Sequence, residues 1–121
     1  MKKKMSSLRI VEVALLVFLG VLIPQLACAT APKSVDLVYD NDKQTLSVTI
    51  DHYTIWTAFH HIQYVEIKKN GKFVSKNEYD DQPTDELFTY TYKIPAVKGD
   101  IFEVTAICNM WGEKTSALTV P

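Results

Sequence analysis

Short runs in which apolar and polar residues alternate one by one fill most of the chain from residue 33 to residue 120. The clearest runs carry their apolar side chains at Leu46, Val48 and Ile50, and at Phe102, Val104, Ala106 and Cys108. A period of two is typical of β-strands with one buried face, and no stretch has helical periodicity over a useful length. Turn residues separate the runs, among them the hairpin pair Asn70-Gly71. About seven such strands predict an all-β fold, an immunoglobulin-like antiparallel β-sandwich.

The first 29 residues have the layout of a secretory signal peptide. Lys2, Lys3, Lys4 and Arg9 precede an apolar run over residues 13–23, and Ala27-Cys28-Ala29 offers small residues in an A-x-A pattern. We therefore expect cleavage after Ala29, a signal peptide at residues 1–29 and an exported, periplasmic or extracellular, domain at residues 30–121. Lipid anchoring at Cys28 is the less favoured alternative. The apolar run is short for a membrane span, and it is removed with the signal peptide. No membrane span is therefore expected in the mature chain.

Cleavage leaves 92 residues, enough for one sandwich domain. The signal holds four of the thirteen basic residues and one of the fourteen acidic residues, which leaves the mature chain a formal charge of −4. This balance does not favour nucleic acid as a partner. Cys108 is the one cysteine left, so the mature chain has no internal disulfide, and its thiol is buried, metal-bound or paired with another chain.

Three residues with metal-ligating side chains fall at strand ends. His52 continues the buried series of Leu46, Val48 and Ile50, Cys108 ends the series of Val104 and Ala106, and His60 starts the expected third strand, residues 60–69. If the strand ends meet, imidazole, imidazole and thiolate form a ligand set for iron, copper or zinc. His61 does not join them, because neighbours in a strand point to opposite faces. The alternative is structural: a cysteine in phase with core residues is often a small buried hydrophobe.

Two segments resemble the iron-binding domain of superoxide reductases and desulfoferrodoxins. His60-His61-Ile62-Gln63-Tyr64-Val65 is similar to that family's His-(Tyr/His)-Ile-x-Trp-Ile strand, with Tyr64 in the place of tryptophan. Cys108-Asn109-Met110-Trp111-Gly112 is similar to the family's Cys-Asn-x-His-Gly motif. The order of elements and the hairpin after the strand agree as well, so the resemblance spans most of residues 33–120.

The resemblance implies ferrous iron held by four imidazoles in a plane and one axial thiolate, with the sixth position open for superoxide. His52 and His60 would be two of the imidazoles and Cys108 the thiolate. Trp111 stands where the family has a ligand histidine, and no histidine lies near residues 30–40, where the family has its first. An indole N–H does not bind metal as imidazole does. We expect the Trp111 indole to fill the space beside the thiolate.

Three protein ligands in place of five predict weaker iron binding, so two functions stay open. The first is an exported superoxide reductase-like, ferrous-iron-binding domain with an incomplete His/Cys site; whether it is an enzyme is left undecided. Met110 beside the site adds a copper-like ligand set as a minor variant. The second is a metal-free, non-catalytic immunoglobulin-like binding module of the cell envelope, with Trp56, Phe59 and Trp111 contacting a partner protein. For Trp56 and Phe59, packing against the rim of the sandwich is the simpler expectation.

Overall fold

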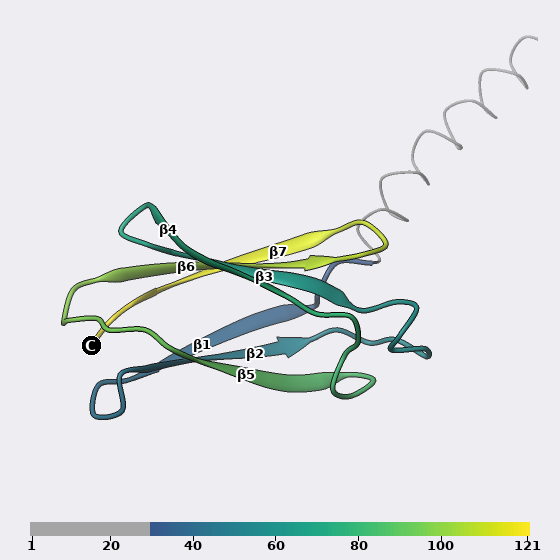
Figure 1. The fold of residues 1–121 in the computed structure, drawn as a ribbon, viewed down its shortest axis with the longest axis horizontal. Coiled ribbons are helices and arrows are strands. Elements are labelled where there is room, and N and C mark those ends of the chain that lie inside the picture. Colours follow the sequence, from purple (N-terminus) through teal and green to yellow (C-terminus); the bar gives the residue numbers. More distant parts are fainter. Residues whose placement is uncertain (1–29) are drawn as a thin grey trace, which may run out of the picture.

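The described part of the chain, residues 30–121 of the computed structural model, consists of β-strands joined by turns and loops (Figure 1). The predicted signal peptide, Cys28 and the cleavage site after Ala29 lie outside it. Seven strands follow one another along the chain: β1 (Ser34–Asp40), β2 (Thr45–Asp51), β3 (Ile62–Lys69), β4 (Lys72–Glu78), β5 (Leu87–Lys93), β6 (Ile101–Cys108) and β7 (Glu113–Thr119). The all-β prediction is confirmed.

The strands form two antiparallel sheets that face each other. One sheet has the order β1-β2-β5 and the other the order β4-β3-β6-β7, and Figure 1 shows them as two layers. A three-stranded and a four-stranded sheet with these neighbours are the arrangement of an immunoglobulin-like sandwich. No helix in the described residues is long and apolar enough to cross a membrane.

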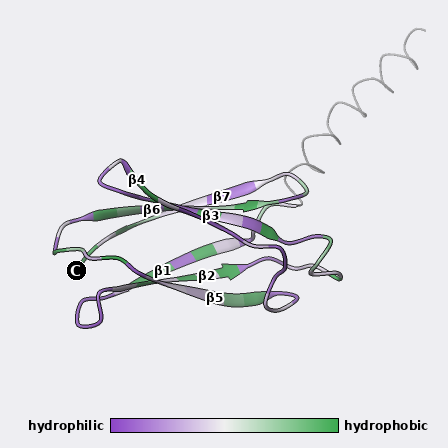
Figure 2. Cartoon of the chain, viewed as in Figure 1, coloured by the Kyte–Doolittle hydropathy of each residue, from purple (hydrophilic) through white to green (hydrophobic). Residues whose placement is uncertain are grey.

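The inward faces of β2 and β6 are buried in the core, as their alternation predicts. Leu46, Val48 and Ile50 of β2 are 0% exposed. Phe102, Val104 and Ala106 of β6 are also 0% exposed and face them from the other sheet. Figure 2 shows hydrophobic stretches on these strands and hydrophilic residues at the β1–β2 and β3–β4 turns. One buried face per strand sets the register, because a slip of one residue would expose the whole apolar set.

The Asn70-Gly71 pair forms the β3–β4 turn, as predicted. Both residues have positive φ, 54° and 77°, which is what a two-residue hairpin loop of type I′ requires. A register shift between Ile67 and Lys68 then twists the hairpin. This turn lies at one end of the sandwich, and the ends of β2 and β6 lie at the other.

The third strand begins later than predicted. β3 starts at Ile62, and His60 lies in the loop from residue 52 to residue 61 that joins β2 to β3. The backbone N–H of His60 donates to Trp56 O at 2.9 Å, a bond between residues four apart that belongs to a tight turn and not to a β-ladder. The end of the sandwich formed by Asp51, Ile62 and Cys108 and the loops beyond them is called the site end below.

Candidate metal centre

His52, His60 and Cys108 meet at the site end. The ligand atoms that these three side chains offer, one nitrogen from each histidine and the cysteine sulfur, lie within 4.8 Å of one another. His52 follows the last residue of β2, His60 lies two residues before β3, and Cys108 is the last residue of β6. The two sheets thus contribute to one cluster, as the sequence predicts.

Strand geometry brings the three together. His52 and Cys108 each extend a series of inward-facing residues, and they are only 3% exposed. Cys108 pairs with Ile62 across the β3–β6 ladder, so the chain just before β3 passes the end of β6. His60 lies in that stretch and reaches back over the cysteine.

His60 contacts both other members of the cluster. Its Nε2 lies 3.1 Å from the Sγ of Cys108. Its ring meets that of His52 edge to face, with centroids 4.8 Å apart and planes at 85°. Bonds of about 2.1 Å to nitrogen and 2.3 Å to sulfur that meet near a right angle separate the two ligand atoms by about 3.1 Å. The 3.1 Å between His60 Nε2 and Cys108 Sγ matches that right-angle geometry and is shorter than the about 3.6 Å of a tetrahedral site.

Burial keeps both partners of that contact uncharged. It raises the pKa of the Cys108 thiol, although the Met110 backbone N–H, 3.4 Å from the sulfur, partly offsets this by favouring the thiolate. Burial also lowers the pKa of His60, and the positive charges of His52 and His61 lower it further when present. A neutral imidazole is ready to bind metal, whereas the thiol must first lose its proton. Metal binding at neutral pH would therefore release that proton.

Asn109 fastens the histidine loop to the end of β6. Its side-chain oxygen accepts the backbone N–H of His61 at 3.0 Å, and its side-chain nitrogen donates to Phe59 O at 2.9 Å. Its own backbone N–H donates to His61 O at 3.1 Å. These bonds flank His60 on both sides and hold it beside Cys108. The sequence singles out Asn109 only as the second residue of the segment that resembles Cys-Asn-x-His-Gly, and this role was not predicted.

His52 is held through both ring nitrogens. Its Nδ1 lies 2.7 Å from the side-chain oxygen of Gln82 and its Nε2 lies 3.0 Å from the backbone oxygen of Thr30. Gln82 comes from the loop between β4 and β5 and is 4% exposed. The sequence did not point to Gln82, because it stands in a loop without periodicity.

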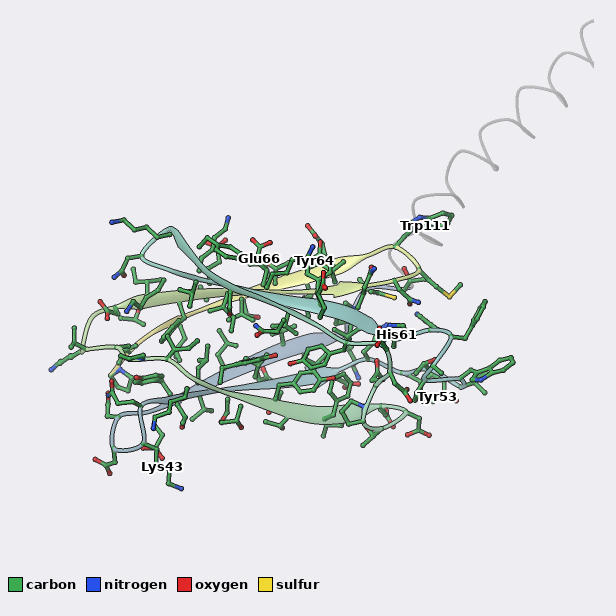
Figure 3. All side chains as sticks on the ribbon, in the orientation of Figure 1. Lys43, Tyr53, His61, Tyr64, Glu66 and Trp111 are labelled. Atoms are coloured by element: carbon green, nitrogen blue, oxygen red, sulfur yellow. The ribbon has the colours of Figure 1, made fainter. Side chains whose placement is uncertain are left out.

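His61 stays out of the cluster, as predicted. Its Nε2 donates to the backbone oxygen of Tyr79 at 3.1 Å, and its Nδ1 is buried without a partner among the described residues. Figure 3 shows His61, Tyr53 and Trp111 at the site end and Lys43 at the opposite end.

Two expectations about the aromatic residues are wrong. Trp111 does not fill the space beside the thiolate: it lies in the β6–β7 turn with a φ of 75°, and its side chain is 80% exposed. Trp56 and Phe59 contact each other, with ring centroids 5.8 Å apart. They are nevertheless 69% and 64% exposed and do not pack into the rim. Trp56, Phe59 and Trp111, called the exposed rim below, thus present apolar surface in the loops of the site end.

The three side chains are of a type that binds transition metals, and His52 must release one ring nitrogen from Gln82 or Thr30 to do so. They do not fit the five-ligand iron site of superoxide reductases. The chain has three histidines in all. His61 is engaged with Tyr79, so four imidazoles in a plane are out of reach. Two imidazoles and a thiolate leave the remaining coordination positions to water or to a substrate, as in open metal sites.

Comparisons with known proteins give one kind of match. No family model matches the chain, and no curated protein matches it. Among solved structures, a variant of superoxide reductase (neelaredoxin) from Ignicoccus hospitalis superposes with a TM-score of 0.46 at 16% identity, over 78% of this chain and 81% of that one. A second variant of that protein gives a TM-score of 0.44 at 14% identity, over 74% and 82%. The function of this chain therefore has to be argued from its own residues.

Proposed function

We propose that the protein is an exported metal-binding β-sandwich in which His52, His60 and Cys108 hold ferrous iron. The centre would resemble that of superoxide reductases but have three protein ligands in place of five. One observation carries the proposal: three side chains of ligand type, from three separate elements, gather within 4.8 Å at one end of the sandwich. A purely structural cysteine has no need of two imidazoles beside its sulfur.

The surroundings of the cluster support a metal role. The sulfur is shielded from water and receives a backbone N–H from Met110 at 3.4 Å, which stabilises negative charge on a thiolate. His60 is only half-buried, so a small ligand can approach from its side. Bound ferrous iron would supply an electron to superoxide, and a thiolate ligand would assist by donating charge. The chain's own residues hold the cation and leave coordination positions open.

Export is proposed on the layout of residues 1–29. We expect the mature protein to begin at Thr30, directly beside the cluster. The mass of the protein recovered from cell envelopes or medium tests this. A chain that starts at Thr30 agrees with the proposal, a lipid-bearing chain that starts at Cys28 supports anchoring, and the full-length mass contradicts cleavage.

Metal content of the mature domain and of a Cys108→Ser variant tests the centre. We expect about one ferrous ion per chain and a thiolate-to-metal charge-transfer band after Co²⁺ substitution, with the band lost in Cys108→Ser. Ala106→Ser is the matched control, since it puts a hydroxyl on the same buried face of β6 two residues earlier, and it should keep the band. A wild-type domain that takes up neither Fe²⁺ nor Co²⁺ would contradict the proposal.

The exposed rim favours a second candidate function, a binding module of the cell envelope. Trp56, Phe59 and Trp111 are 69%, 64% and 80% exposed, and exposed aromatic side chains at one end are typical of protein-binding surfaces. If this is the function, the double variant Trp56→Ala/Trp111→Ala should lose a crosslinked envelope partner that wild type retains with or without metal. Phe73→Ala, at the opposite end and 63% exposed, is the control. A partner retained by the double variant would exclude the rim as its binding surface.

A further inference from the structure

We propose that the exposed rim inserts into the surface of a lipid bilayer, so that the site end of the sandwich faces the membrane. The inference goes beyond the proposed function and requires no bound metal. Both tryptophans of the chain, Trp56 and Trp111, belong to the rim. Two further side chains of the same loops' end, Tyr53 and Ile55, are also exposed, Ile55 to 90%, and Figure 3 shows Tyr53 and Trp111 at the site end. Tryptophan and tyrosine are the side chains enriched at membrane–water interfaces.

Hydrogen bonds hold the β2–β3 loop in the form that exposes its apolar residues. Thr54 is buried, its backbone N–H donates to Asp85 O at 2.8 Å, and its hydroxyl accepts the backbone N–H of Trp56 at 3.2 Å. The backbone N–H of Phe59 donates to Trp56 O at 3.1 Å. The loop thus turns its polar groups inward and presents its apolar side chains as a fixed surface. An apolar surface of this kind marks an interaction site.

The start of the described chain identifies a membrane as the partner. The Thr30 hydroxyl donates to Trp111 O, and Thr30 O lies 3.0 Å from His52 Nε2, so the chain enters the sandwich beside the rim. Residues 24–29 alone separate Thr30 from the apolar run of the predicted signal peptide. A segment of that length spans about 20 Å when fully extended. An apolar run in the membrane during export, or a lipid on Cys28, would therefore hold the rim next to the bilayer.

The charge of the site end favours a zwitterionic lipid surface. The β4–β5 loop, which contacts the β2–β3 loop, exposes four acidic residues, Asp80, Asp81, Asp85 and Glu86. Lys33 and Lys114 lie at the same end, but the acidic residues outnumber them. The turns at the opposite end carry four lysines, Lys43, Lys69, Lys72 and Lys98. Anionic lipids attract basic segments and repel acidic ones, so they would bind the opposite end and not the rim.

Intrinsic tryptophan fluorescence tests the inference, because both tryptophans of the chain lie in the rim. The mature protein is mixed with phosphatidylcholine vesicles and, separately, with vesicles that also contain phosphatidylglycerol. We expect flotation with the phosphatidylcholine vesicles, a blue-shifted emission, and quenching by lipids with brominated acyl chains. Phosphatidylglycerol should weaken binding at low salt, because the acidic loop faces the same surface, and added salt should reduce the difference.

Variants show whether the rim makes the contact. Trp56→Ala and Trp111→Ala should each weaken vesicle binding about 10-fold, since each removes a large apolar side chain from the lipid surface, and the double variant should not float. Phe73→Ala is the control, because Phe73 is an exposed aromatic residue at the opposite end; it should bind as wild type does. All three side chains are exposed, so urea unfolding should show the same stability in every variant.

Three results would overturn the inference. The first is a wild-type protein that binds neither kind of vesicle. The second is binding that phosphatidylglycerol strengthens and that Trp56→Ala/Trp111→Ala leaves unchanged, which would assign the contact to the lysines of the opposite end. The third is a rim that crosslinks to an envelope protein while protein-free vesicles stay unbound, which would favour the protein-binding module. Metal content affects none of these results, so failure of the metal centre is distinguishable from failure of this inference.

Discussion

His60 and Cys108 titrate in opposite directions for one physical reason: burial penalises the charged form of each side chain. The pKa of His60 is lowered, and that of the Cys108 thiol is raised. In the folded, metal-free domain at neutral pH, both groups are uncharged and lie in contact. Neutrality helps the metal-free domain to fold, and it means that a bound cation must compete with the proton on sulfur.

The free energy of unfolding of the metal-free domain should therefore decrease both at low pH and at high pH. Below the ordinary histidine pKa of 6.5, the unfolded chain binds a proton that folded His60 resists, so the free energy of unfolding decreases as pH falls. Above the ordinary thiol pKa of 9.0, the unfolded chain loses a proton that folded Cys108 retains, so it decreases as pH rises. Urea unfolding of chelator-treated protein across this range measures both slopes.

Two variants show which side chain causes the loss of stability at low pH and which causes it at high pH. His60→Gln should flatten the acid side between its folded pKa and 6.5, and Cys108→Ser should flatten the alkaline side just above 9.0. Asp81 and Asp100 have lowered pKa values and act only near or below 3.8, while Tyr90, raised to about 12, acts above 10.0. An acid slope that persists unchanged in His60→Gln would show that another group causes it.

At the scale of the elements, the strands were predictable and the loops were not. The alternation of apolar and polar residues indicates which residues of β2 and β6 face inward. It also predicted correctly that His52 and Cys108 lie at the ends of these strands. Apart from the Asn70-Gly71 hairpin, no comparable rule governs the turns. The start of β3, the outward Trp111 side chain and the buried Gln82 depend on local backbone angles and single hydrogen bonds, which leave no periodic trace in a sequence.

The β6–β7 turn supports the site through Gly112. Its φ is 102°, and a Cβ there would lie 2.6 Å from the backbone nitrogen of Ala31. The Cys108 N–H donates to Gly112 O at 3.0 Å, and the Thr30 hydroxyl donates to Trp111 O. The turn thus joins the cysteine to the segment that carries the Thr30 carbonyl beside His52.

Gly112→Ala should cost more stability than Gly99→Ala. Both glycines have positive φ, 102° and 92°, but nothing lies within 4 Å of a Cβ at Gly99. Backbone strain alone predicts about 1–3 kcal/mol for Gly99→Ala. Gly112→Ala adds a clash with the Ala31 backbone and should also weaken Co²⁺ binding, because it shifts the cluster. Equal losses of unfolding free energy in the two variants would contradict the close approach at Ala31.

At the scale of the whole molecule, the core supplies stability and one end gathers the candidate metal ligands. The described residues contain a single cysteine, which is free, so no disulfide braces the fold and the buried faces of both sheets must suffice. The ligand cluster, the Asn109 and Gln82 contacts and the exposed rim all lie at the site end. Sandwich folds commonly carry functional residues at strand ends and in the adjoining loops, which a rigid core holds in place.

X-ray absorption of the Fe²⁺-loaded domain, residues 30–121, reports whether His52, His60 and Cys108 bind the iron. We expect one sulfur neighbour at about 2.3 Å together with imidazole scattering from two histidines, and loss of the sulfur shell in Cys108→Ser. A first shell of oxygen and nitrogen only, unchanged by Cys108→Ser, would mean that the iron binds elsewhere and that the cluster of His52, His60 and Cys108 is not a metal centre.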